Sequence, residues 1–224
     1  MLATNLRQTR QTSVGPIMKK HIRVLSIDDH PLMREGIAQV INLQPDMRIV
    51  AQVSSGREAL SSFREHQPDI ALMDLRLPDM NGIDAMTAIK AEFPEARIII
   101  LTTFDGDIEI QRALAAGAHS YVLKSMPPEE LAETVRQVYR GGKRISPQIA
   151  AQLAEHLSEI PLSEREMDVL RRVMTGNRNR DIALDLCVTE ETVKSHMKRI
   201  MEKLGATDRT QAVTIALRRG FLEL

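Results

Sequence analysis

The chain has 224 residues, of which 43% are hydrophobic and only 3% aromatic, and its 30 basic side chains balance 30 acidic ones. This length suits two domains, since single domains cluster at about 100 to 150 residues. The single cysteine, Cys187, excludes an internal disulfide framework, and no apolar run approaches the roughly 20 residues of a membrane span. Because a secretory leader is also absent, we expect a cytoplasmic protein with no membrane partner.

The net charge of zero conceals an asymmetry along the chain. Residues 21–140 carry 12 basic and 18 acidic side chains, whereas residues 141–224 carry 14 basic and 12 acidic ones. An acidic first part and a mildly basic second part predict different partners for the two parts. The basic excess is small enough to belong to an ordinary solvated surface, so it does not by itself indicate nucleic-acid binding.

Residues 1–20 are rich in Gln, Thr and Arg and show no hydrophobic period, which predicts a disordered leader. Met18 offers a second start of translation. From residue 22 onward, short β-branched runs alternate with amphipathic segments. The predicted strands cover residues 22–27, 48–53, 70–74, 97–103 and 120–124. The predicted helices between and after them cover residues 31–43, 55–66, 81–93, 107–116 and 127–140.

This alternation predicts an α/β domain over residues 21–140, with a doubly wound, five-stranded parallel sheet. The run 97–101 is apolar on both faces, as expected of a strand covered by helices on each side of the sheet. In such folds the ligand binds beyond the carboxyl ends of the strands. The polar residues at those ends are Asp28, Asp29, Asp74, Thr102 and Lys124.

The pattern changes after Arg140. The pair Gly141-Gly142 ends the preceding helix, and residues 141–161 are predicted to be a linker with a helical stretch at 148–157. Beyond it only helical periods remain, which predicts a second, all-α domain at residues 162–224. Its four helices are expected at 163–176, where Ser163 and Glu166 match a capping box, and at 178–186, 189–204 and 208–219.

The three carboxylates at strand ends would repel one another unless a cation lay among them. A hard divalent ion such as Mg²⁺, which prefers oxygen ligands, is the expected occupant. A carboxylate beside Mg²⁺ can act as a nucleophile toward phosphorus and form an aspartyl phosphate. Thr102 and Lys124 would then supply a hydroxyl and an ammonium group to the phosphoryl oxygens. Any one aspartate at a strand end is more often a turn residue, so the combination carries the prediction.

His30 follows the acid pair directly. Adjacent side chains on a chain that leaves a strand point apart, so we expect His30 to pack at the start of the first helix. A role as metal ligand or phosphate carrier is the less favoured alternative.

Four motifs together resemble the receiver domain of bacterial response regulators over roughly residues 21–140. They are Asp28-Asp29, the run MDLRLPDMNG at 73–82, Leu101-Thr102-Thr103, and Ser120-Tyr121-Val122-Leu123-Lys124. The resemblance implies a flavodoxin-like fold in which a sensor histidine kinase phosphorylates Asp74. It also implies that Thr102 and Tyr121 form a switch pair. The implied Mg²⁺ ligands are Asp28, Asp29, Asp74 and the backbone carbonyl of Arg76.

In the second domain, Cys187-Val188 forces a sharp turn between two helices, as a helix-turn-helix requires. The helix at 189–204 has one apolar stripe, formed by Val193, Met197, Ile200, Met201 and Leu204. Its opposite face carries Lys194, Ser195, Lys198 and Arg199. Two lysines on an isolated helix indicate a solvated face more often than a DNA contact, so the context decides.

That context resembles the LuxR-type DNA-binding domain over residues 162–221. The matching segments are Leu162 to Glu166, Gly176, Asp181-Ile182-Ala183, Thr192 to His196, Lys203-Leu204-Gly205 and Arg209 to Val213. The resemblance implies that the helix at 189–204 enters the major groove of double-stranded DNA. Base contacts are then expected from Lys194, Ser195 and Lys198, and phosphate contacts from Arg199, Lys203 and Arg209.

Together the two resemblances imply a two-component response regulator of the NarL/FixJ type. Phosphorylation at Asp74 would control sequence-specific DNA binding and transcription, with a homodimer on DNA formed through the helix at 208–219. In the resting state the receiver is expected to cover the recognition helix.

Two other readings stay open at this point. A Mg-dependent phosphatase could also use an aspartyl phosphate, but such enzymes place a second carboxylate two residues after the nucleophile, where this chain has Arg76. We therefore expect no enzyme beyond slow autodephosphorylation. A phosphorylation-independent DNA-binding regulator, or a receiver used only for protein interaction, is disfavoured because the full set of acids, threonine and lysine is present.

Overall fold

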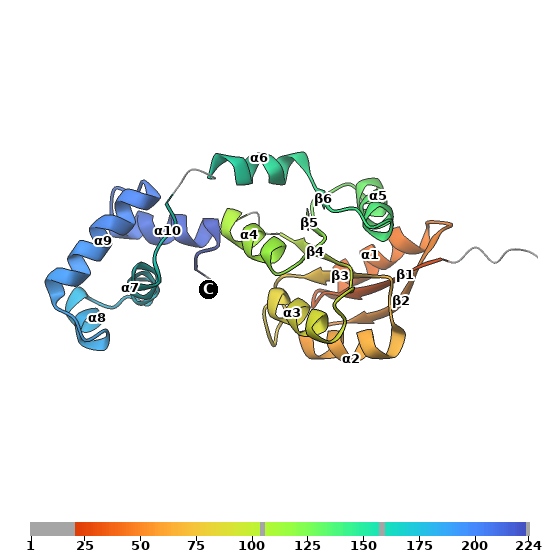
Figure 1. The fold of residues 1–224 in the computed structure, drawn as a ribbon, viewed down its shortest axis with the longest axis horizontal. Helices are drawn as coiled ribbons and strands as arrows, with labels where there is room; N and C mark the ends of the chain where they lie inside the picture. The colour runs from red at the N-terminus through yellow and green to blue at the C-terminus, as the bar shows by residue number, and fades with distance from the viewer. Residues whose placement is uncertain (1–20, 104–105, 157–159, 223–224) are drawn as a thin grey trace, which may run out of the picture.

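The computed structural model describes residues 21–103, 106–156 and 160–222, so the predicted leader at 1–20 lies outside the described residues. Within them, one parallel sheet has the strand order β2-β1-β3-β4-β5-β6 (Figure 1). The strands are β1 (Ile22–Ile27), β2 (Met47–Val53), β3 (Ile70–Asp74), β4 (Ile98–Thr102), β5 (Ser120–Leu123) and β6 (Arg144–Ile145). The doubly wound parallel sheet is confirmed.

The predicted number of five strands is wrong for this sheet. The additional strand, β6, pairs in parallel with β5 and places Ile145 opposite Tyr121. With only two residues, β6 contributes backbone hydrogen bonds to the edge of the sheet and buries no apolar face of its own. Hydrophobic periodicity, the signal used to find the other strands, is therefore absent from it.

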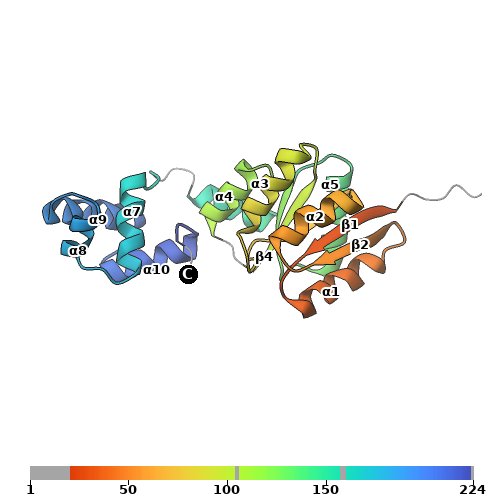
Figure 2. The same ribbon diagram turned by 90° about the horizontal axis from the view of Figure 1, so that it is seen from below.

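Helices cover both faces of the sheet (Figures 1 and 2). On one face α1 (Pro31–Asn42) and α5 (Pro128–Tyr139) pack side chains such as Ile41 and Val135 against the strands. The other face is covered by three helices, α2 (Gly56–His66), α3 (Gly82–Glu92) and α4 (Asp107–Ala115). Burial on both faces explains why β3 and β4 are continuous apolar runs up to their last residue.

The loop after β3 is held by short-range constraints that the sequence encodes. Asn81 caps α3 by accepting a hydrogen bond from the backbone N–H of Ile83 at 2.8 Å. The backbone N–H of Gly82 donates to the carbonyl of Leu75 at 2.8 Å. A Cβ atom on Gly82 would lie 2.2 Å from the backbone oxygen of Asp74, so only glycine fits here. The start of α3 is thereby pressed against the end of β3.

The second domain contains α7 (Glu164–Met174), α8 (Asn179–Asp185), α9 (Glu190–Leu204) and α10 (Arg209–Arg219). Its helices share a separate core, with members such as Leu170, Ile182 and Ile200. The predicted capping box opens α7, since Ser163 and Glu166 exchange hydrogen bonds with each other's backbone N–H groups. The predicted stripe of α9 is buried as expected, except for Met201, which is partly buried.

Between the two domains, α6 (Pro147–Glu155) packs on the first domain through Ile149 and Leu153. The two domains also meet directly, where α4 contacts α10 and Ile108 of α4 packs against the core of the helical domain. Both views place the carboxyl end of α10 beside α4 (Figures 1 and 2). No helix among the described residues has the length and apolar character needed to cross a membrane.

Candidate functional site

The carboxyl ends of the strands bring a buried lysine between two buried carboxylates. Asp28 follows β1, Asp74 ends β3 and Lys124 follows β5. The Lys124 Nζ atom lies 2.8 Å from an oxygen of Asp28 and 2.7 Å from an oxygen of Asp74. The side chains of Asp28, Asp74 and Lys124 are only 1%, 3% and 6% exposed. The three residues predicted from different strand ends therefore form one ionic cluster.

The pKa values in this cluster follow from burial and from the neighbouring charges. Burial raises the pKa of Asp74 above its ordinary value, and the charge of Asp28 adds to this, although Lys124 opposes both. Burial alone would lower the pKa of Lys124, but the hydrogen bonds to Asp28 and Asp74 outweigh it and leave that pKa raised. Asp74 is thus a carboxylate whose negative charge has room for further compensation by a cation.

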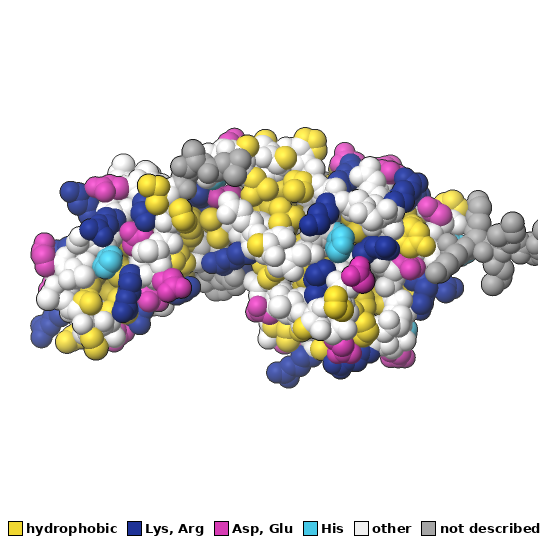
Figure 3. All heavy atoms as spheres, viewed as in Figure 1, with side chains coloured by type: hydrophobic (Ala, Val, Ile, Leu, Met, Phe, Trp, Pro, Cys, Tyr) yellow, Lys and Arg dark blue, Asp and Glu magenta, His cyan; other side chains and the backbone are white. Residues whose placement is uncertain are grey.

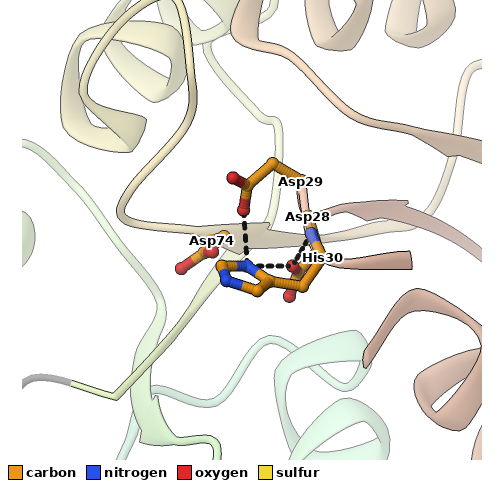
Figure 4. A group of neighbouring side chains, drawn as sticks. All are labelled: Asp28, Asp29, His30 and Asp74. Carbon is orange, nitrogen blue, oxygen red and sulfur yellow. Dashed lines mark hydrogen bonds and ion pairs between the residues drawn. The ribbon is translucent and has the colours of Figure 1, made fainter. Parts of the chain in front are cut away.

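A metal ion could be held at the exposed side of this cluster. Asp28, Asp29, His30 and Asp74 each offer a ligand atom, and these atoms all lie within 4.8 Å of one another (Figure 4). Asp29 is 34% exposed, and an open pocket of about 500 Å³ reaches Asp74 and Lys124. Three carboxylates in reach of solvent are the oxygen donors that a hard divalent cation prefers, so the donor set fits Mg²⁺.

The expected orientation of His30 is wrong. Its ring folds back over the acid pair, with Nδ1 at 2.6 Å from an oxygen of Asp29 and at 3.5 Å from an oxygen of Asp28 (Figure 4). The cause is a tight turn after β1, in which the backbone N–H of His30 donates to the Asp28 side chain at 2.9 Å. The alternation of side chains along an extended strand no longer applies in such a turn.

The remaining predicted residues of this site lie around the ionic cluster. Thr102 ends β4 fully buried, and its carbonyl accepts a hydrogen bond from the Lys124 backbone N–H at 2.7 Å. Tyr121 is fully buried in β5, opposite Ile100 of β4. Arg76 lies two residues after Asp74, and its backbone N–H donates to Asp74 Oδ1 at 3.4 Å.

Sequence reasoning missed two acidic residues in the first turn of α4. Glu109 accepts a hydrogen bond from the Arg76 guanidinium at 2.8 Å, and Asp107 binds the Arg219 guanidinium at the end of α10. Both carboxylates are only 2% exposed. Acidic residues in a first helical turn are common, because the helix dipole favours them, so their sequence positions gave no signal of these partners.

In the helical domain, the polar face of α9 is open to solvent. Lys194 and Lys198 are 54% and 77% exposed, and Ser195 and Arg199 are also exposed. Figure 3 shows basic side chains on this domain, interspersed with acidic ones. The expectation that the receiver covers the recognition helix is therefore wrong for this structure, because the first domain contacts α10 instead.

Two further predicted DNA contacts are engaged within the domain. Lys203 lies 2.7 Å from Glu166 and donates to the carbonyl of Pro161 at 3.0 Å. Arg209 donates to Asn179 at 3.0 Å and to the carbonyl of Asn177. Among the predicted contacts, those on α9 itself are thus the readily available ones.

Comparison with known proteins agrees with both halves of the structure. A model of the response regulator receiver domain matches residues 24–136, and a model of the luxR family of bacterial regulatory proteins matches residues 160–216. An uncharacterized transcriptional regulatory protein of Bacillus subtilis, YxjL, is 40% identical over 216 residues, which cover 92% of this chain and 99% of that protein.

Two more relatives extend over nearly the whole chain. The response regulator VraR of Staphylococcus aureus is 37% identical over 207 residues, covering 90% of this chain and 99% of VraR. The crystal structure of the response regulator ChrA, from a heme-sensing two-component system, is 33% identical with a TM-score of 0.55. That alignment covers 90% of this chain and 99% of ChrA.

A receiver domain followed by a LuxR-type DNA-binding domain defines a transcriptional response regulator of two-component systems. This chain belongs to the NarL/FixJ type of these regulators.

Proposed function

We propose that Asp74 is the phosphoacceptor of this regulator and that a sensor histidine kinase is its donor. The observation that carries this proposal is the placement of Lys124 against Asp74 at 2.7 Å, with Thr102 at the neighbouring strand end. Lys124 would bind a phosphoryl oxygen once the group is attached, and the Thr102 hydroxyl would bind another. Tyr121, buried beside them in β5, would respond to the movement of Thr102.

Mg²⁺ is the cofactor that we propose for this site. Asp29, Asp74 and the backbone carbonyl of Arg76 would hold it, with Asp28 assisting. When bound, the ion would neutralise charge on the transferred phosphoryl oxygens. Asp74 carries the nucleophilic oxygen, and Lys124 keeps Asp28 and Asp74 apart from bulk solvent while compensating their charge.

Incubation with a small phosphodonor and Mg²⁺ tests the phosphoacceptor. Intact mass spectrometry should show one added phosphoryl group, and peptide mapping should locate it on Asp74. Asp74→Asn should abolish the addition, whereas Asp84→Asn, which removes an exposed carboxylate in the first turn of α3, should leave it unchanged. Rapid turnover of many phosphoesters without a stable adduct would instead favour the phosphatase alternative.

The same reaction should depend on the divalent ion. Removal of Mg²⁺ with a chelator should stop phosphorylation of Asp74, and addition of Mg²⁺ should restore it. If the adduct formed at the same rate without the ion, the cofactor assignment would be wrong while the phosphoacceptor could stand. Slow loss of the phosphoryl group over time would measure autodephosphorylation.

For DNA we propose base contacts by Lys194, Ser195 and Lys198, with Arg199 on the flanking phosphates. The exposure of these side chains along one face of α9 supports this proposal. Phosphate contacts by Lys203 and Arg209 would require these residues to leave the partners that they have in this structure. We also propose that the active form on DNA is a homodimer joined through α10, with the receiver at residues 21–140, the linker at 141–161 and the DNA-binding domain at 162–224.

Binding to a library of DNA sequences tests the base contacts. Lys198→Ala should relax the preference at one or two base positions, at a cost of about 1 to 3 kcal/mol for the preferred site. A residue that touches only phosphate should instead weaken all sequences equally and lower the salt slope by about one. Lys143→Ala, an exposed change in the linker, is the matched control and should leave sequence preference intact.

A further inference from the structure

The first turn of α4 holds the two domains from one place. Glu109 binds Arg76, two residues after Asp74, through an oxygen at 2.8 Å from the guanidinium. Asp107 binds Arg219 of the DNA-binding domain through two hydrogen bonds, at 3.0 and 2.8 Å. Both carboxylates are almost completely buried, and Arg219 is only 12% exposed. One helical turn thus contacts both the phosphoacceptor loop and the end of α10.

The contact between α4 and α10 is too close for additional atoms. A Cβ atom on Gly106 would lie 2.7 Å from the backbone carbon of Arg219. A Cβ atom on Gly220 would lie 2.5 Å from Cγ of Glu109. Glu109 therefore does two things at once, because its stem packs against the end of α10 while its carboxylate binds Arg76. Movement of this side chain must affect Gly220.

From these contacts we infer that Arg76 and Glu109 couple the phosphorylation state of Asp74 to the closed arrangement of the two domains. A phosphoryl group adds about −1.5 to −2 charges at Asp74, against a single negative charge on Glu109. Arg76 is next to that charge, since its backbone already donates to the Asp74 side chain. The inference rests on the proposed role of Asp74 as phosphoacceptor.

The direction of the effect follows from this competition. When the Arg76 guanidinium turns to the phosphoryl oxygens, Glu109 loses a cationic partner in a buried position. Loss of one partner from a buried ion pair is costly, unlike the loss of an exposed one. Glu109 then moves toward solvent or another cation and no longer fits against Gly220. The pairing of Asp107 with Arg219, on the same turn of α4, weakens with it, and the domains separate.

The distance between the domains can be measured through the single native cysteine. Cys187 is exposed in the DNA-binding domain, and Ser61→Cys adds a second exposed position on α2 of the receiver. Spin labels at the two sites report the distance distribution by pulsed electron resonance. Beryllofluoride with Mg²⁺ serves as the stand-in for the phosphoryl group. In the otherwise wild-type chain, it should convert a narrow distribution into a broader and longer one.

Glu109→Gln and Arg76→Ala test the coupling itself. Either change removes the charge pairing between the loop and α4, so the open population should rise severalfold without beryllofluoride, and beryllofluoride should then add little. Circular dichroism checks that each variant is folded. Two variants are used so that loss of folding in one does not decide the result.

Two glycine substitutions serve as references for the interface. Gly106 has a φ of −60°, which alanine adopts freely, so Gly106→Ala strains only the contact with Arg219 and should open the domains. Gly36→Ala places its methyl group where no atom lies within 4 Å and should keep the closed distribution and its response.

The outcomes separate the inference from the proposed function. If beryllofluoride shifts the amide resonances around Asp74, but the charge variants keep the wild-type distance and response, the inference is wrong and the phosphoacceptor stands. If beryllofluoride leaves those resonances unchanged in the wild-type chain, the proposed function fails, and the inference fails with it.

Discussion

Glu166 illustrates how one buried side chain serves both a helix and a domain. Its carboxylate accepts hydrogen bonds from the Ser163 backbone N–H and from Lys203, each at 2.7 Å. Burial alone would raise the pKa of Glu166, but these donors outweigh it and hold the pKa below its ordinary value. The start of α7 is thus tied to the end of α9 by a charge that must be negative.

A pH dependence follows from this lowered pKa. The contribution of Glu166 to folding is fully present above the pKa of the unfolded chain, about 4.3, and is lost as the pH falls through the lower folded value. Glu166→Gln should lower the free energy of unfolding by about 1 to 3 kcal/mol at neutral pH, and this difference should shrink below about pH 4. Urea titrations at several pH values measure it.

The control is Glu202→Gln, which removes an exposed carboxylate from α9. It should change the free energy of unfolding by less than about 0.5 kcal/mol at every pH. A cost for Glu166→Gln that stayed constant down to pH 3 would contradict the charged role of Glu166.

Gly82 makes a second prediction at the scale of one residue. Gly82→Ala would drive a methyl group into the backbone oxygen of Asp74, so we expect a loss of about 3 kcal/mol or a displaced loop. Gly36→Ala, in open space on α1, should be neutral or stabilise by about 0.5 to 1 kcal/mol. Thermal unfolding compares the two. Equal behaviour of both variants would show that the start of α3 yields to the added methyl group.

The acidic site was largely predictable at the residue scale, because parallel strands place their carboxyl ends at one edge. Asp28, Asp74 and Lys124 meet there as expected. The orientation of His30 and the partner of Arg76 were not predictable. The first depends on a turn that reverses the side-chain direction, and the second on a helix whose position the sequence does not specify.

At the scale of elements, hydrophobic periodicity located the helices and strands because most of them bury one or two faces. The helix expected at 189–204 is α9, with Thr189 as its cap, and the stretch expected at 148–157 contains α6. The strand β6 escaped because pairing with its neighbour, rather than burial, makes it a strand. Signals from burial therefore reveal packed elements and miss elements held only by backbone hydrogen bonds.

The cap of the recognition helix gives a prediction at this scale. The Thr189 hydroxyl accepts a hydrogen bond from the Thr192 backbone N–H at 3.2 Å, so Thr189→Ala should destabilise the start of α9 by about 1 kcal/mol. Hydrogen exchange of the first turn of α9 should speed up accordingly. Thr214→Ala, an exposed change on α10 that leaves the cap intact, should not alter this exchange.

At the scale of the whole molecule, the arrangement of the domains could not be predicted. Asp107 and Arg219 are separated by 112 positions, and neither lies in a motif that marks it as a contact. Their meeting depends on the path of α6 and on the fit of Gly106 and Gly220. A resemblance to a family predicts which domains a chain has, whereas surface complementarity between them belongs to the individual chain.

The short strand β6 has a consequence for dividing the molecule. Together with α6 it covers the edge of β5 and adds Ile149 and Leu153 to the receiver core, although both elements lie after residue 140. A fragment of residues 21–140 would leave the backbone of β5 unpaired at the sheet edge, which favours association with other chains. We expect this fragment to aggregate where residues 21–156 stay monomeric in light scattering. Equal solubility of the two fragments would mean that the edge is harmless without its cover.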